Sequence, residues 1–319
     1  MNNSPRIVFM GTPEFAVESL RKLVENGYQV VGVVTMPDKP VGKHHSVLQA
    51  SPVKEYALSQ NIPLLQPKKL KDAGFLEQLS AWNADLQIVV AFRMLPEAVW
   101  NMPRLGTFNL HASLLPQYRG AAPIQWAIIN GEKETGVTTF FLTHTIDTGK
   151  IIFQERVAIE PSDTAGVIHD RLMYLGAQLV IKTVDAISND KIKTVAQETL
   201  TIDESNLKPA PKIFNETCEI DWNKSSNEIY NLIRGLSPYP AAWTVLKTNK
   251  GESIHCKIFE SEKIIQAHHL LPGTIDSHDN NCLKIATSDG FIQVKRIQQA
   301  GKKRMTIEEF LRGNLHLLF

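Results

Sequence analysis

Cysteine is scarce in this sequence, and so is an excess of charge of either sign. Cys218, Cys256 and Cys282 are the three cysteines among 319 residues, and no two of them form a C-x-x-C pair. Such odd, sparse usage is typical of a reducing compartment and argues against a disulfide framework or a zinc site. The 34 Lys and Arg residues are balanced by 33 Asp and Glu residues, giving a net charge of +1. No global field therefore draws the whole chain onto nucleic acid.

Long apolar runs are also missing. No run approaches the roughly 18 apolar residues that a membrane span needs. The apolar run Ile7–Met10 is too short for a signal-peptide core. We therefore expect a cytoplasmic protein without a membrane partner.

Glycine-rich phosphate loops and metal-ligand spacings are absent too. Neither G-x-G-x-x-G nor the P-loop pattern occurs, so Gly11-Thr12-Pro13 is better interpreted as a tight turn, with Thr12 as the cap of the next helix. No H-E-x-x-H and no Cys/His ligand spacing is found, and we expect no metal.

What is present begins with alternating apolar strands and amphipathic helices. Strand-like runs at 7–10, 28–35 and 88–92 alternate with helical spacings that begin near residues 13, 51 and 75. Further strands are indicated at 106–113, 137–143 and 151–159, and a long helix follows to about residue 189. This alternation predicts an α/β fold with a mostly parallel, doubly wound sheet.

The character of the chain changes after residue 189. Residues 190–211 are polar and are closed by Pro209 and Pro211, so we predict an interdomain linker there. One helix at 227–236 then precedes short strands divided by turn signals, which predicts a small β-barrel or half-barrel. The predicted organisation is a domain at 1–189, a linker at 190–211 and a second domain at 212–319.

The densest chemical signal is the run from Asn109 to Pro123. Asn109 and His111 are two residues apart in a predicted strand and therefore face the same side of the sheet, at the carboxyl end where open parallel sheets place their sites. The amide of Asn109 can donate a hydrogen bond to an oxygen that gains negative charge. His111 can stabilise that charge or move a proton near neutral pH.

A third group often orients such an imidazole, and Asp147 in Thr145–Gly149 is the candidate. By itself, an aspartate in such a sequence more often forms a turn than orients an imidazole. His144 is either a second imidazole or part of a loop surface.

Two basic segments leave alternatives open. The loop at 39–49, with Lys39 and Lys43, is either a surface excursion or a lid. The second domain carries a dense group of cations that is either a solvated face or a contact to a nucleic-acid backbone: Lys295, Arg296, Lys302, Lys303 and Arg304.

Taken together, these motifs resemble the 10-formyltetrahydrofolate-dependent formyltransferases. The resemblance lies in Asn109-x-His111, in Ser113–Gln125 and in Asp147-Thr148-Gly149. The segments 7–16, 51–54, 134–138 and 300–303 support it, so that it spans nearly the whole chain.

The resemblance implies a fold, a reaction and a set of site residues. The fold is a Rossmann-like domain followed by an OB-like barrel that binds tRNA. The activity is transfer of the formyl group of 10-formyltetrahydrofolate, the co-substrate, to the α-amino group of methionyl initiator tRNA for translation initiation, by a monomer. The catalytic residues are Asn109, His111 and Asp147, and the tetrahydrofolate-binding residues are Ser113, Leu114, Leu115 and Pro116. The lysines and arginines listed above, with Lys39 and Lys43, are the expected tRNA contacts.

The sequence also departs from the family pattern, and rival functions stay open. The loop at 39–49 is less basic than is usual, Arg93 in Ala91–Pro96 has no explanation, and the end from Asn314 is atypical. The rivals are a formyltransferase for a sugar nucleotide or glycinamide ribonucleotide, a 10-formyltetrahydrofolate hydrolase, and a non-catalytic RNA-binding module. The basic stretch at 300–304 disfavours the first, the chain length the second and the intact trio the third.

Overall fold

The computed structural model describes residues 4–41, 47–200, 203–276 and 282–318, in two compact units. The first unit comprises residues 1–120, 135–157 and 169–209, and the second comprises 121–134, 158–168 and 210–319. Two short segments of the predicted first domain thus pack within the second unit. The domain boundaries given above stay a prediction.

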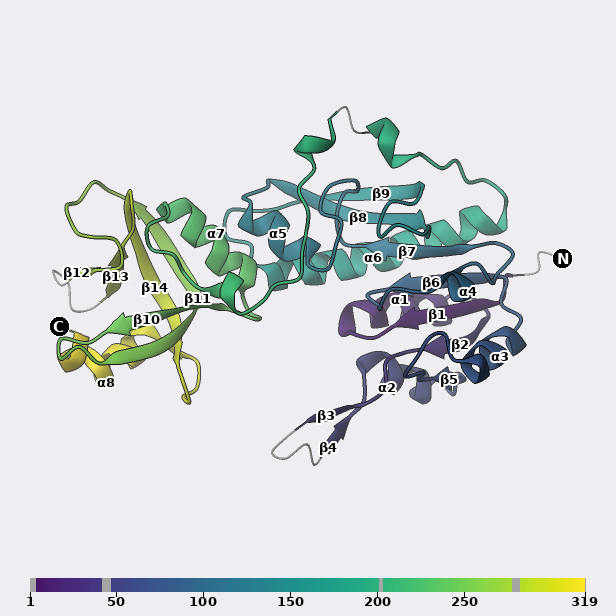
Figure 1. The fold of residues 1–319 in the computed structure, drawn as a ribbon, viewed down its shortest axis with the longest axis horizontal. Helices are drawn as coiled ribbons and strands as arrows, with labels where there is room; N and C mark the ends of the chain where they lie inside the picture. Colours follow the sequence, from purple (N-terminus) through teal and green to yellow (C-terminus); the bar gives the residue numbers. More distant parts are fainter. Residues whose placement is uncertain (1–3, 42–46, 201–202, 277–281, 319) are drawn as a thin grey trace. The chain divides into compact units, whose positions relative to one another are not determined.

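The first unit is built on a seven-stranded sheet in the order β5-β2-β1-β6-β7-β8-β9 (Figure 1). The five strands from β5 to β7 are parallel, and β8 is antiparallel to β7. The predicted mostly parallel α/β sheet is therefore confirmed. The strands are β1 (Ile7–Gly11), β2 (Val30–Val34), β5 (Leu64–Leu65), β6 (Leu86–Val90), β7 (Thr107–His111), β8 (Glu134–Phe141) and β9 (Ile151–Ala158).

Helices follow most of these strands, and some of the helices begin at a residue whose side chain caps the first turn. Ser51 accepts a hydrogen bond from Lys54 N and caps α2, as predicted. The prediction for Thr12 was wrong: Pro13 occupies the cap position of α1, and the buried Thr12 hydroxyl has no partner among the described residues. The helices are α1 (Glu14–Glu25), α2 (Pro52–Ser59), α3 (Ala73–Ala81), α4 (Glu97–Trp100), α5 (Pro123–Ile129) and α6 (Ala165–Ser188).

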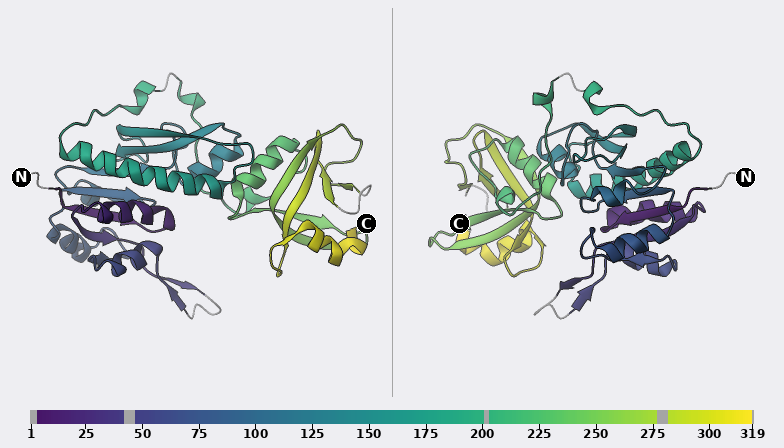
Figure 2. Two further views of the ribbon diagram at one scale, coloured as in Figure 1. Left: turned by 180° about the vertical axis from the view of Figure 1, so that it is seen from behind. Right: turned by 45° about the vertical axis from the view of Figure 1, so that its right-hand side comes forward.

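The second unit contains an antiparallel sheet in the order β10-β11-β14-β13-β12, with β15 paired to β14 (Figure 2). The long strands β11 and β14 curl around an apolar core that α7 and α8 help to close. This is the half-barrel that the turn signals predicted. Its elements are α7 (Ser226–Leu236), β10 (Ala242–Lys247), β11 (Ser253–Ile265), β12 (Ile275–Asp276), β13 (Leu283–Ala286), β14 (Gly290–Gln299), β15 (Met305–Thr306) and α8 (Ile307–Leu318).

A close helix contact explains why residues 121–134 belong to the second unit. A Cβ on Gly235 of α7 would lie 2.7 Å from Cγ1 of Ile129 in α5, so the two helices touch where glycine leaves room. The buried Arg234 guanidinium also donates a hydrogen bond to the Asp163 carbonyl at 3.0 Å. Both contacts join segments that are far apart in the sequence.

In its described parts, the polar segment at 190–211 packs along the first unit as far as residue 209. Val195 exchanges backbone hydrogen bonds of 2.8 and 2.9 Å with Ile151 at the edge of the sheet. Tyr118 N donates to the Lys208 carbonyl at 2.7 Å. The segment includes the short 3-10 turns η2 (Gln197–Leu200) and η3 (Glu204–Asn206), and η4 (Glu216–Cys218) follows it.

The loop at 39–49 is a hairpin in its described parts. Its strands β3 (Lys39–Val41) and β4 (Val47–Gln49) pair in antiparallel register. Lys43 lies outside the described residues.

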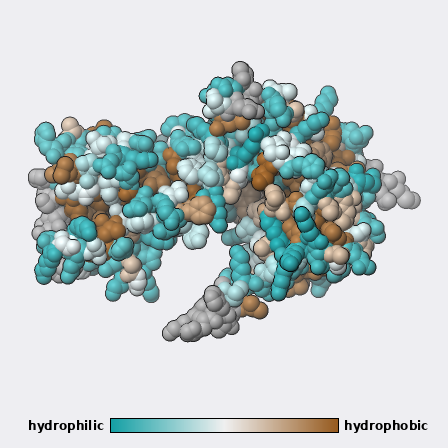
Figure 3. Space-filling view, in the orientation of Figure 1, coloured by the Kyte–Doolittle hydropathy of each residue, from teal (hydrophilic) through white to brown (hydrophobic). Residues whose placement is uncertain are grey.

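The face drawn in Figure 3 is mostly hydrophilic, with apolar residues dispersed over it. Among the described residues, no helix is both long and apolar enough to span a bilayer.

Candidate active site

Asn109 and His111 project from β7, which lies between β6 and β8 in the sheet. Alternation along the strand places both side chains on the same face. Asn109 is half-buried, and His111 is 8% exposed. The carboxamide of Asn109 has no hydrogen-bond partner among the described residues, so its N–H groups are available to a substrate. Strand β7 therefore presents one free donor and one nearly enclosed imidazole.

The two nitrogens of the His111 ring have different surroundings. Nε2 lies 2.8 Å from the Tyr118 carbonyl oxygen. A carbonyl can only accept, so Nε2 carries the proton in the neutral ring. Nδ1 is then the nitrogen that can accept a proton, and it lies 3.9 Å from Oδ2 of Asp147. The Tyr118 carbonyl fixes the tautomer, and the carboxylate can balance the charge that forms on protonation.

Asp147 reaches His111 from the loop between β8 and β9. Strand β8 ends at Phe141 opposite Phe108, whereas His111 pairs with Thr138, so the loop must run back along the sheet to bring Asp147 beside the imidazole. Asp147 has a left-handed backbone conformation, with φ of 56°. Its Oδ2 accepts a hydrogen bond from Gly120 N at 2.9 Å. Asp147 therefore comes close to His111 only because this loop folds back.

Close packing explains why glycine occupies the last position of the Asp147-Thr148-Gly149 motif. A Cβ at this position would lie 1.6 Å from the Phe141 carbonyl oxygen, and backbone cannot move aside as a flexible side chain can. We expect Gly149→Ala to lower the free energy of unfolding by at least about 2 kcal/mol, because steric overpacking adds to the displacement of the loop.

Chemical denaturation measures that change. Gly313→Ala is the matched control, since nothing lies within 4 Å of a Cβ in that exposed turn of α8. The control is expected to gain about 0.5–1 kcal/mol, because alanine restricts the unfolded chain. Equal stability of the two variants would contradict the steric argument.

The predicted folate-binding residues form the loop directly after β7. Ser113 is fully buried, and its hydroxyl donates to the Gln117 carbonyl at 2.7 Å. Leu115 is 2% exposed and packs against Phe140 and Ile151. Leu114 and Pro116 are half-buried. The side chains of Ser113 and Leu115 thus shape the loop from inside, and their contact with folate stays a prediction.

Two residues that the sequence left unexplained or undecided hold neighbouring loops. The Arg93 guanidinium donates to the carbonyls of Lys68 and Pro67, which ties the segment after β6 to the loop after β5. His144 packs edge-on against Trp100, with ring centroids 5.3 Å apart, and lies 3.7 Å from Glu97. His144 is therefore part of a loop surface, and the Asp147 loop lies against α4.

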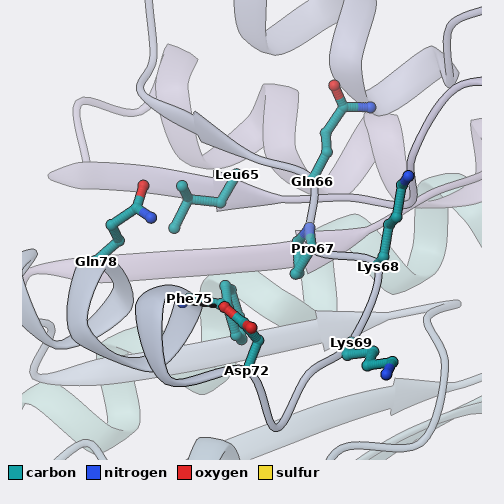
Figure 4. A pocket seen from close by; sticks show the side chains of 8 residues that line it. All are labelled: Leu65, Gln66, Pro67, Lys68, Lys69, Asp72, Phe75 and Gln78. Atoms are coloured by element: carbon teal, nitrogen blue, oxygen red, sulfur yellow. Dashed lines mark hydrogen bonds between the residues drawn. The ribbon is translucent and has the colours of Figure 1, made fainter.

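A cavity of about 410 Å³ opens beside the loop after β5 (Figure 4). It is lined by residues 65–69 and by Asp72, Phe75 and Gln78 of α3 and its cap. It includes none of the predicted site residues.

The predicted cations of the second unit have three kinds of surroundings. Lys295 is paired with Glu262 at 3.0 Å and Arg296 with Glu260 at 3.3 Å, across neighbouring strands. Lys302 and Lys303 are exposed in the turn between β14 and β15, and neither forms an ion pair within the described part of the chain. The Arg304 guanidinium stacks 3.6 Å above the Phe259 ring.

Sequence reasoning missed one residue of this site. Gln197 lies in the segment predicted as a linker, yet its side chain is fully buried and contacts the Asp147 loop. Nothing in the local pattern marked it, because the polar residues around it are typical of a solvated connection.

Two family models match almost all of this fold. The formyl transferase model covers residues 5–184, and the model of the formyl transferase C-terminal domain covers residues 212–315. The chain belongs to the formyl transferase family and is an enzyme of that class. The family resemblance drawn from the sequence is thereby confirmed.

Curated relatives narrow the comparison to one activity. The methionyl-tRNA formyltransferase of Bacteroides thetaiotaomicron is 63% identical over 97% of this chain and 95% of its own length. The methionyl-tRNA formyltransferase of Flavobacterium johnsoniae is 56% identical, over 97% and 96% of the two chains.

Solved structures share the fold at low identity. An N-formyltransferase from Helicobacter canadensis, solved with folinic acid and dTDP-3-aminofucose, matches with a TM-score of 0.64 and 22% identity, over 92% and 99% of the two chains. HypX from Aquifex aeolicus in complex with tetrahydrofolic acid matches with a TM-score of 0.61 and 17% identity, over 98% and 48% of the two chains.

Proposed function

We propose that this enzyme transfers the formyl group of 10-formyltetrahydrofolate to the α-amino group of methionyl initiator tRNA. The observation that carries the proposal is the high identity to methionyl-tRNA formyltransferases along nearly the whole chain. The arrangement of Asn109, His111 and Asp147 supplies the groups that this reaction needs. The products are N-formylmethionyl-tRNA and tetrahydrofolate. A substrate of this kind suits a cytoplasmic enzyme, and the trio lies in one chain, in keeping with a monomer.

The chemistry begins with the neutral amine. A free α-amino group has a pKa of about 7.7–8.0, so its deprotonation near pH 7 costs little. The amine attacks the formyl carbon, and a tetrahedral adduct forms with negative charge on the former carbonyl oxygen. Asn109 donates its free N–H to this oxygen, which stabilises the adduct more than the ground state.

His111 then handles the proton of the attacking amine. Nδ1 accepts the proton directly or through one water, because Nε2 is committed to the Tyr118 carbonyl. Asp147, 3.9 Å away, stabilises the cationic ring that results. The adduct collapses as the bond between the formyl carbon and N10 of the folate breaks, and the ring returns the proton to that nitrogen. No covalent bond to the enzyme is needed.

The direct test is a formyl-transfer assay with charged initiator tRNA, charged elongator tRNA and 10-formyltetrahydrofolate. Formylation of the initiator alone supports the proposal. Consumption of the folate without formylation of either tRNA would point to hydrolysis or to a small amine acceptor. A sugar nucleotide carrying an amine serves as the third acceptor, since one structural neighbour is a sugar 3N-formyl transferase and another was solved with dTDP-3-aminofucose.

The tRNA substrate gives Lys302 and Lys303 a role as phosphate contacts. We expect the double variant Lys302→Ala/Lys303→Ala to raise KM for tRNA roughly tenfold with kcat nearly unchanged, because both cations are free to replace counterions on the backbone. The salt dependence of log kcat/KM is expected to flatten by about 0.7–0.9 for each lost phosphate contact.

Lys295→Ala/Arg296→Ala is the matched comparison. Glu262 and Glu260 already offset these charges, so its effect on KM is expected to be smaller. A fall of kcat without a change in KM or in the salt slope, after loss of Lys302 and Lys303, would contradict a phosphate contact.

A further inference from the structure

The side chain of Gln197 forms several hydrogen bonds near Asn109, His111 and Asp147. Its side chain is fully buried, although it comes from the polar segment between α6 and the second unit. The amide Nε2 donates two hydrogen bonds of 2.8 Å, to the carbonyls of Asp147 and Gly149. The carbonyl Oε1 accepts from Nε and Nη2 of Arg119, at 3.1 and 2.7 Å. One carboxamide therefore holds two loops together.

Each of the two loops carries a group that lies beside the His111 ring. Arg119 lies between Tyr118, whose carbonyl accepts from Nε2, and Gly120, whose N–H donates to the Asp147 carboxylate. Asp147 carries that carboxylate in a left-handed conformation, which is costly for a residue with a side chain unless surrounding contacts hold it. The two hydrogen bonds from Gln197 to this loop are contacts of that kind.

From this arrangement we infer that Gln197 is a positioning residue of the reaction. Its carboxamide fixes the Asp147 loop against the turn at residues 118–120, and so sets the places of the carboxylate and the carbonyl on either side of the imidazole. The inference rests on the proposed function, because it gives Gln197 a role only through His111. The segment 190–211 is on this view part of the active-site frame.

Gln197→Glu is the sharpest substitution for testing this role. It keeps the size of the side chain and an acceptor for Arg119, but it removes both donors and turns an oxygen toward two carbonyls. We expect kcat to fall about 10- to 100-fold, since small displacements of catalytic groups have effects of this size. KM for each substrate should stay within about twofold. Gln197→Met, which lacks both donor and acceptor, should act in the same direction.

A double-mutant cycle with His111→Gln separates positioning from a general structural defect. If Gln197 acts through the imidazole, Gln197→Glu should change kcat by less than about threefold once His111 is absent. An undiminished loss in that background would overturn the inference. If His111→Gln alone left kcat unchanged, the assignment of the trio would be the part that fails.

Stability has to be followed in the same variants. Thermal unfolding of both Gln197 variants shows whether the folded enzyme persists at the assay temperature, and kcat is referred to the folded fraction. Glu198→Gln, an exposed change at the next residue, is the matched control and should retain full activity. A Gln197→Glu enzyme that is folded and fully active would also overturn the inference.

Discussion

Replacement of Asn109 by alanine is expected to lower kcat/KM about 10²- to 10³-fold, the loss typical of a single oxyanion donor. The physical reason is that no other described residue binds the Asn109 carboxamide, so its N–H is kept for the substrate. Because the donor acts on charge that exists only in the adduct, kcat should fall while KM for tRNA stays within about twofold. Steady-state formylation of initiator tRNA measures both quantities.

Asn109→Asp sharpens this test, because it keeps the shape of the side chain and removes the donor. A carboxylate would also face the negative oxygen, so this variant should be at least as slow as Asn109→Ala. Asn189→Ala, in an exposed asparagine at the end of α6 that bonds the Asp185 carbonyl, is the control and should keep its activity. A rise in KM at unchanged kcat for Asn109→Ala would mean ground-state binding instead of oxyanion stabilisation.

The His111–Asp147 pair should give the second large effect. We expect His111→Gln to lower kcat about 10²- to 10⁴-fold, the range for loss of a general acid–base group. Glutamine can still donate to the Tyr118 carbonyl but offers no nitrogen that accepts a proton. Asp147→Asn keeps an acceptor for Gly120 N and removes only the charge, so its loss should be smaller. Single-turnover formylation assays measure the loss of rate in both variants.

The two residues should not act independently. Asp147 is useful only when the ring becomes charged, so the double variant should be no more than about threefold slower than His111→Gln alone. Losses that multiply in full would contradict a pair that acts as one unit. Asp170→Asn, an exposed acid of the same structural unit, is the control for the removal of one negative charge.

Much of the fold could be predicted because its signals are local. The apolar run at 88–92 predicted a strand buried on both faces, and the strand lies at Leu86–Val90, two residues earlier. Ser51-Pro52 specifies a helix start in two residues. The half-barrel followed from turn residues that divide short strands. Thr12 failed as a cap because the chain enters α1 one residue later, at Pro13, and no local rule separates the two positions.

The candidate site, too, could be predicted only in part from local signals in the sequence. Asn109 and His111 could be paired from the sequence alone, since strand periodicity fixes their shared face. Asp147 could be named only as a candidate, because no periodicity connects a strand with a loop 36 residues further along. The resemblance to the formyl transferases then favoured Asp147 and supplied the residues from Ser113 to Pro116. The tRNA contacts were predicted from charge density, which does not distinguish the paired Lys295 from the exposed Lys302.

The sequence by itself determined the residue types of the candidate site: a donor and an imidazole on one strand, in a chain whose motifs are those of the formyl transferases. Tertiary structure decided how those groups are arranged. It placed the Tyr118 carbonyl on Nε2, brought the Asp147 carboxylate back to within 3.9 Å of Nδ1 and buried Gln197 between the two loops. The physical reason is that a tautomer, an ion pair and a buried hydrogen-bond network depend on atoms from distant segments meeting in space, which residue type and spacing do not encode.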